Sequence, residues 1–104
     1  MTLSDRVAIS ELLAEYGALL TDKQRDMLSM YCEMDLSLSE IATEYQVSRQ
    51  AVRDSMQRAI ASLEEYESKL GYVRLRSEIS ALLTKVDESN WKDAIAEIAS
   101  KLEV

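Results

Sequence analysis

Residues 37–59 read SLSEIATEYQVSRQAVRDSMQRA, and their pattern decides the fold. Ser37 stands three residues before Glu40, the spacing of a capping box that begins a helix. The pattern breaks at residues 46–48, where Ser48 is a typical N-cap of a second helix. A short helix, a turn of about three residues and a second helix form a helix-turn-helix, whose second helix enters the major groove of DNA. The stretch therefore predicts a DNA-binding motif.

The two predicted helices divide their residues between a packed side and an exposed side. Ala42 is small enough for a close helix crossing, and we expect Ile41, Val47 and Val52 to form an apolar wedge there. Arginine and glutamine make paired hydrogen bonds to guanine and adenine edges, and a serine at the helix start can contact a phosphate. The predicted DNA-binding residues are Ser48, Arg49, Gln50, Arg53, Asp54, Gln57 and Arg58.

An apolar seam continues along the second helix of this motif. Its members recur at alternating spacings of four and three, the heptad pattern of a helix that packs along another helix. That other helix can belong to the same chain or to a second copy, and we expect a homodimer. The residues of this dimer or helix-packing seam are Val52, Met56, Ala59, Leu63, Tyr66 and Leu70.

The composition predicts an all-α fold. The 104 residues include no proline and only two glycines, and helix-favouring residues dominate throughout. We expect a single helical domain over residues 1–104, with the helix-turn-helix at about 37–63, a long fourth helix and a C-terminal helical extension at about 72–104. Its class is that of winged-helix-like DNA-binding folds without a wing.

The residues that usually carry enzyme chemistry are missing. The chain has no histidine, and its single cysteine, Cys32, has no partner for an internal disulfide. Neither glycine lies in a phosphate-binding loop. We therefore expect no enzyme, no cofactor and no metal site. No signal peptide or membrane-spanning run is visible, so we expect a cytoplasmic protein that does not insert into membranes.

Two stretches carry a resemblance to known proteins. Residues 37–63 resemble the region-4 helix-turn-helix of bacterial sigma factors, with the framework SLxEIA…VSR…V. Residues 12–70, with ALLTDKQ, SLSEIATEYQVSRQAV and LEEYESKL, resemble the YlxM-like family of small helix-turn-helix proteins of Gram-positive bacteria. The resemblance implies an all-helical cytoplasmic protein encoded beside the signal-recognition-particle GTPase, with a role in serving or regulating that protein-targeting pathway.

The sequence departs from these patterns at two positions. Gln46 occupies the turn position where such motifs usually carry glycine, so the backbone there must accept a left-handed residue or turn differently. Arg53 stands where the YlxM-like pattern has an aromatic residue, whereas sigma-like motifs often have arginine. The second departure favours contact with nucleic acid.

The charge of the chain leaves two functions open. The net charge is −7, yet residues 38–63 carry three arginines and three acidic residues, so the motif itself is neutral. DNA-binding domains draw most of their affinity from basic patches. The first interpretation is a dimeric DNA-binding regulator. The alternative is an accessory factor that binds the protein or the RNA of the signal recognition particle, with its acidic ends facing a basic partner. A third reading, in which the arginines are merely solvated or paired with nearby acids, makes the motif a scaffold.

Overall fold

The computed structural model describes residues 1–103, and every regular element among them is helical. This confirms the predicted all-α fold. The contacts divide the chain into two compact units, Met1–Leu70 and Gly71–Val104. We expected one domain with an extension from about residue 72, and the boundary between the units falls close to that point.

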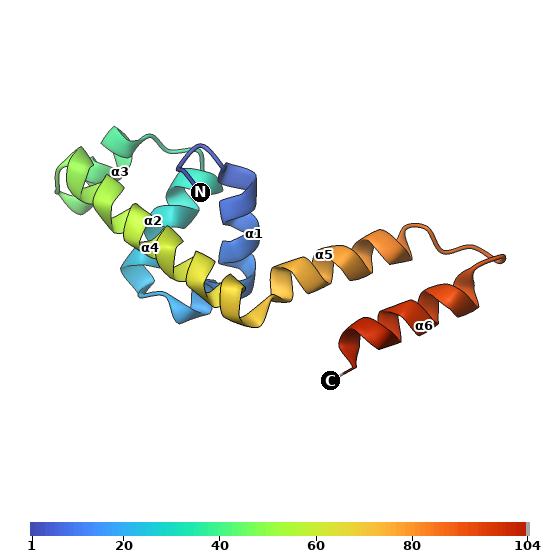
Figure 1. Cartoon of the computed structure of the whole chain (residues 1–104). Helices are drawn as coiled ribbons and strands as arrows, with labels where there is room; N and C mark the ends of the chain where they lie inside the picture. Colours follow the sequence, from blue (N-terminus) through green and yellow to red (C-terminus); the bar gives the residue numbers. More distant parts are fainter. Residues whose placement is uncertain (104) are drawn as a thin grey trace. The chain divides into compact units, whose positions relative to one another are not determined.

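The first unit, Met1–Leu70, consists of four α-helices and one 3₁₀ turn. The helix α4 is the longest, and it packs against α1, α2 and α3 (Figure 1). The elements are α1 (Arg6–Tyr16), the 3₁₀ turn η1 (Gly17–Leu19), α2 (Asp22–Cys32), α3 (Leu38–Tyr45) and α4 (Arg49–Leu70).

Capping boxes begin two of these helices. At α2 the Gln24 backbone N–H donates to Thr21 Oγ1 over 3.2 Å, and the Thr21 N–H donates to Gln24 Oε1 over 3.3 Å. At α3 the equivalent reciprocal pair joins Ser37 and Glu40, with both distances 3.1 Å. Each box satisfies two backbone N–H groups that the helix cannot pair. The start of the helix-turn-helix at Ser37 is therefore confirmed.

The first helix is shorter than the sequence suggests. The apolar pattern predicts one helix over about residues 3–20, but α1 begins at Arg6 and ends at Tyr16. Before it, the Asp5 N–H donates to the Thr2 carbonyl over 3.1 Å, which closes a turn instead of a helix. After it, the chain tightens into η1. Hydrophobic periodicity continues through both segments because Leu3 and Leu20 are buried without being helical.

The core of the first unit is apolar. The buried side chains of the described residues are hydrophobic, and the one hydroxyl among them, on Tyr16, donates to Glu67 Oε1 over 2.5 Å. All four helices contribute to this core, which fixes the position of α4 against the other three. The largest fully buried side chains are those of Tyr16, Ile9, Met27, Leu28, Ile41, Met56, Ile60, Leu63 and Val52.

The predicted seam of α4 is part of this core. Val52, Met56, Ala59 and Leu63 are all 0% exposed within the single chain. Nearer the helix end, the hydroxyl of the half-buried Tyr66 donates to the Leu19 carbonyl over 3.5 Å. Leu70 is 47% exposed. The sequence left open which helix covers the seam, and most of it is covered by the chain's own helices because α4 is the central helix of the unit. Val52, Met56, Ala59 and Leu63 are therefore not accessible to a second copy.

The second unit, Gly71–Val104, is a helical hairpin. The helices α5 (Tyr72–Leu83) and α6 (Trp91–Leu102) run antiparallel (Figure 1). The loop between them is organised by Asp87, whose Oδ1 accepts from the Ser89 backbone N–H over 2.8 Å and from the Ser89 hydroxyl over 2.6 Å. Along the hairpin, Lys101 Nζ lies 3.2 Å from Glu78 Oε2.

Candidate nucleic-acid interface

The turn of the helix-turn-helix consists of three residues, 46–48, as predicted. Gln46 has φ 55° and ψ 45°, so of the two alternatives that the sequence left open, a left-handed residue or a different turn, the structure has the left-handed residue. The Val47 N–H donates to the Ala42 carbonyl over 3.0 Å, and the Gln46 N–H donates to the Thr43 carbonyl over 3.2 Å. These two bonds form a Schellman motif, which ends α3 and satisfies two of its last carbonyl groups.

The crossing of α3 and α4 is close and apolar. Ala42 is 5% exposed, and Ile41 and Val52 are fully buried. Val47 is 38% exposed, so its predicted place as a buried wedge is wrong. The reason lies in the Schellman motif, because the left-handed Gln46 turns the chain outward one residue before Val47.

Ser48 caps the second helix. Its Oγ accepts from the Ala51 backbone N–H over 3.0 Å, as expected for an N-cap. The hydroxyl proton is not used by this bond, so Ser48 can still donate to a phosphate oxygen. The first turn of α4 thus combines an exposed serine with the positive end of a helix dipole.

All seven predicted DNA-binding residues are exposed, in the first half of α4 or at its cap. At about 100° per residue, Gln50, Arg53 and Gln57 fall within about 60° of one another around the helix. Arg58 lies about 140° from Arg53, on the other flank. The helix therefore brings Gln50, Arg53 and Gln57 together and sets Arg58 apart.

Gln50 and Asp54 are partners of each other. Gln50 Nε2 donates to Asp54 Oδ1 over 2.8 Å. This bond occupies the only carboxylate in the predicted DNA-binding set. It also leaves the amide oxygen of Gln50 available for a hydrogen bond outward.

The three arginines of α4 have no acidic partner. Within residues 1–103, no carboxylate oxygen lies within 4.0 Å of the guanidinium nitrogens of Arg49, Arg53 or Arg58. Asp54 stands four residues before Arg58, a spacing that often forms an ion pair, but it accepts from Gln50 instead. The reading in which these arginines are neutralised by neighbouring acids thus has no support in the geometry.

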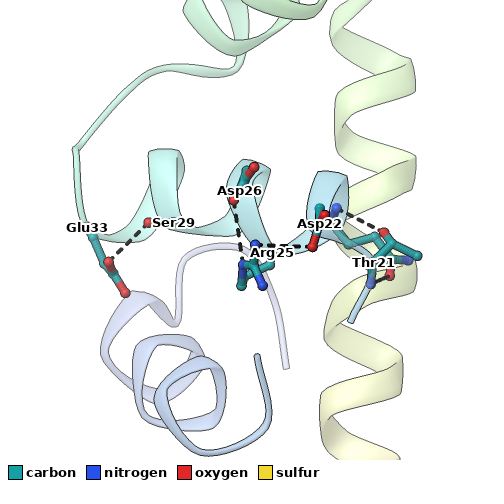
Figure 2. A network of polar contacts seen from close by, with 7 residues as sticks. Thr21, Asp22, Arg25, Asp26, Ser29 and Glu33 are labelled. Carbon is teal, nitrogen blue, oxygen red and sulfur yellow. Dashed lines mark hydrogen bonds and ion pairs between the residues drawn. The ribbon is translucent and has the colours of Figure 1, made fainter. Parts of the chain in front are cut away.

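The other arginines of the first unit are paired. Arg6 forms an ion pair with Asp35 and lies over the Tyr31 ring, 4.2 Å from its centroid. Figure 2 shows Arg25 on α2 between two carboxylates, 3.2 Å from Asp22 and 3.6 Å from Asp26. The unpaired arginines of the first unit therefore all lie on α4, whereas the arginine of α2 is held among acids.

One basic side chain near the motif was not predicted. Lys23 on α2 places its Nζ 5.9 Å from the centroid of the Tyr45 ring, at the end of α3. Burial, and then the charges of Asp26 and Glu44, raise the pKa of Tyr45, so its phenol stays neutral and can donate. Tertiary packing of α2 against α3 creates this neighbourhood, so no spacing in the sequence could have indicated it.

The described residues provide neither a metal site nor a membrane-spanning helix. In the part of the chain that the structure describes, no group of three or more His, Cys, Asp or Glu side chains could hold a metal ion. None of the helices up to residue 103 has both the length and the apolar character needed to cross a membrane.

Comparison with known proteins supports the motif. Residues 3–103 match the UPF0122 family, which is described as "Putative helix-turn-helix protein, YlxM / p13 like". The chain is 39% identical over 102 residues to a UPF0122 protein of Fusobacterium nucleatum, covering 98% of this chain and 99% of that protein. It is 43% identical over 102 residues to a UPF0122 protein of Bacillus pumilus, covering 98% and 93%.

A third relative matches a shorter stretch of the chain. The chain is 53% identical over 70 residues to a UPF0122 protein of Lacticaseibacillus casei, a match that spans 67% of this chain and 62% of that protein. The matches to the first two relatives run through both units. The chain therefore belongs to the UPF0122 family of YlxM- and p13-like proteins.

Proposed function

We propose that this protein is a regulatory DNA-binding protein that inserts the first half of α4 into the major groove. It acts by binding and not by catalysis, in the cytoplasm. The single observation that carries the proposal is the charge pattern of the first unit. Arg49, Arg53 and Arg58 on α4 are exposed and free of carboxylates, while Arg6 and Arg25 on other helices are paired.

Each residue of the interface has a chemical task in this proposal. Arg53 donates two hydrogen bonds to a guanine edge, and Gln50 pairs with an adenine edge after releasing Asp54. Gln57 lies on the same strip one turn later and can extend the contact. Ser48 and Arg49, at the helix start, hold phosphate oxygens and fix the register of the helix on the duplex. Arg58, on the other flank, is placed for a backbone phosphate and not for a base.

The experiment is a salt titration of binding. Purified protein is added to labelled duplex DNA from upstream of its own gene, and anisotropy is followed at several salt concentrations. We expect saturable binding that weakens steeply with salt, because each phosphate contact releases counterions and contributes about −0.9 to the logarithmic slope. Arg53→Ala should cost about 1–3 kcal/mol of base discrimination. Arg58→Ala should weaken all sequences alike and reduce the slope by about 1.

Arg25→Ala is the matched control. It removes the same charge from the same unit, but from a side chain already held by Asp22 and Asp26. It should leave the salt slope and the base discrimination unchanged. Equal losses in Arg25→Ala and Arg53→Ala would show that only net charge matters and would contradict the assigned interface.

The second candidate function is an accessory factor of the signal recognition particle that binds the particle's protein or RNA. The observation in its favour is the charge of the first unit, where seven basic side chains face thirteen acidic ones, a net charge of −6. A surface of that sign suits a basic protein partner. The particle's RNA and its GTPase, used as parallel probes in the same titration, separate the two candidates. Binding to either probe, with none to DNA at low salt, would select the second.

A further inference from the structure

The hairpin of Gly71–Val104 leaves large apolar side chains exposed. None of the residues of α5 is fully buried, and on α6 only Ala94 is. Six large side chains are about half exposed: Tyr72 at 49%, Leu83 at 58%, Val86 at 40%, Trp91 at 46%, Ile95 at 58% and Leu102 at 56%. Contiguous apolar surface of this kind marks an interaction site in a folded protein.

The exposed residues of α6 form one strip. Trp91, Ile95 and Leu102 are spaced by four and seven residues, so they fall within about 40° of one another around the helix. Ala94 and the half-buried Ile98 lie beside this strip, on the side that packs against α5. The strip therefore continues the same apolar face of α6 that carries Ala94 and Ile98, and α5 covers that face only in part.

A hairpin of this size does not bury enough surface to be stable by itself. Chains below about 40 residues usually need a disulfide, a metal or association with another chain. The hairpin contains no cysteine, and none of its described residues belongs to a group that could hold a metal ion. Association is the remaining route, so something must cover the strip.

Charge and surface pattern select a second copy of the hairpin as that partner. Residues 71–104 carry five basic and six acidic side chains, a net charge of −1, so two hairpins repel each other little. The first unit, at −6, has no matching apolar strip. Its large exposed apolar side chains lie singly on different elements, at Met1, Val7, Leu19, Met34, Val47 and Leu70. An isologous interface needs only that the same strip appear on both copies.

We propose that two copies of this chain associate through their α5–α6 hairpins to form a four-helix bundle, with Trp91, Ile95 and Leu102 at its centre. Up-and-down bundles of four helices are built from pairs of such hairpins. This inference goes beyond the proposed function, because it concerns only the hairpin and holds whether or not α4 binds DNA. It assigns dimerisation to α5 and α6 in place of the seam of α4.

The fluorescence of Trp91 can be used to follow the hairpin in the full chain. Trp91 is the only tryptophan, so its emission reports on the hairpin alone. Sedimentation at micromolar concentration should give twice the 11.8 kDa mass of one chain. Dilution should shift the Trp91 emission to longer wavelength at the concentration where the mass halves. A mass of 11.8 kDa with blue-shifted emission at all concentrations would overturn the proposal in favour of intramolecular docking.

A charged pair of substitutions completes the test. Ile95→Lys with Leu102→Lys should convert the dimer to a single chain, raising its dissociation constant at least a hundredfold. Val7→Lys, at a side chain 76% exposed on α1, is the matched control and should leave the mass doubled. The NMR methyl signal of Ile41, in the core of the first unit, verifies that this unit of the variant is folded. A double variant that stays dimeric, or a wild-type protein that is monomeric at tens of micromolar, would contradict the bundle.

Discussion

Leu63 in α4 and Leu83 in α5 are identical side chains in neighbouring helices of one chain, yet Leu63 is 0% exposed and Leu83 is 58% exposed. The same contrast in burial holds for the two units to which these leucines belong. Met1–Leu70 has an apolar core to which all four of its α-helices contribute, while Gly71–Val104 has two helices that cover each other only in part. The first unit covers the apolar face of α4 with its own helices. The second has surface left over for a partner.

The largest expected effect tests this difference directly. Leu63→Ala should destabilise the first unit by about 2–5 kcal/mol, because it removes buried methyl groups and leaves a cavity. Leu83→Ala should change the stability of that unit by less than about 0.5 kcal/mol. Urea unfolding followed by the methyl signals of Ile41 and Ile95 reports on the two units separately. If Leu63→Ala and Leu83→Ala lowered the free energy of unfolding read from the Ile41 signal by similar amounts, the two units would not unfold independently.

Two smaller effects on stability, opposite in sign, are expected at Gln46 and Gly71, two of the three described residues with a positive φ. Their φ values are 55° and 65°. A side chain in this conformation costs about 1–2 kcal/mol, offset in part by the greater freedom of glycine in the unfolded chain. Gln46→Gly should therefore stabilise the first unit by about 0.5–1 kcal/mol.

Gly71→Ala should act in the opposite direction, at a cost of about 1 kcal/mol. A Cβ at this position would meet only Arg74 Nη2 at 3.7 Å, an ordinary contact, so backbone strain and not crowding is the cause. Thermal unfolding of both variants measures whether each substitution raises or lowers the stability. Destabilisation by Gln46→Gly would mean that the Gln46 side chain makes a favourable contribution that outweighs its strain.

Local chemistry explains which features the sequence predicts. The capping boxes at Thr21 and Ser37 and the cap at Ser48 involve residues three apart, so spacing alone identifies them. The left-handed Gln46 is one of the two alternatives that the sequence leaves open, because such motifs usually carry glycine at this turn position. These features place α3 and α4, and with them the exposed row of Gln50, Arg53 and Gln57.

Tertiary packing determines the features that the sequence does not predict. A heptad seam specifies that α4 packs on a helix but not on which one, so the role of Met56 and Leu63 in the unit's own core is visible only in the structure. Spacing equally suggests that Asp54 pairs with Arg58, yet Asp54 accepts from Gln50. The competition between two partners at the same helical spacing is decided by side-chain geometry, which no pattern encodes.

The smallest expected effect is a pH dependence confined to the hairpin. Bonds from the Ser89 hydroxyl, from the Ser89 backbone N–H and from the Asn90 backbone N–H lower the pKa of Asp87. A carboxyl group with a lowered pKa stabilises the folded loop above its unfolded pKa of about 3.9, and this contribution is lost as the pH falls through the folded value. Acidification below about pH 4 should therefore loosen the start of α6, where Asp87 organises the loop.

Ser89→Ala isolates this effect, because it removes the first of those bonds and keeps the backbone ones. Its Asp87 pKa, read from the carboxyl signal in an NMR titration, should lie closer to the ordinary value than that of the wild type. Thr21→Ala is the matched control, since it removes a capping hydroxyl from the first unit, whose partner Gln24 does not titrate. An unchanged Asp87 pKa in Ser89→Ala would leave the backbone N–H groups as the whole cause. In that case the hairpin loop would be held in the same way as the Schellman turn at Gln46, by main-chain geometry alone.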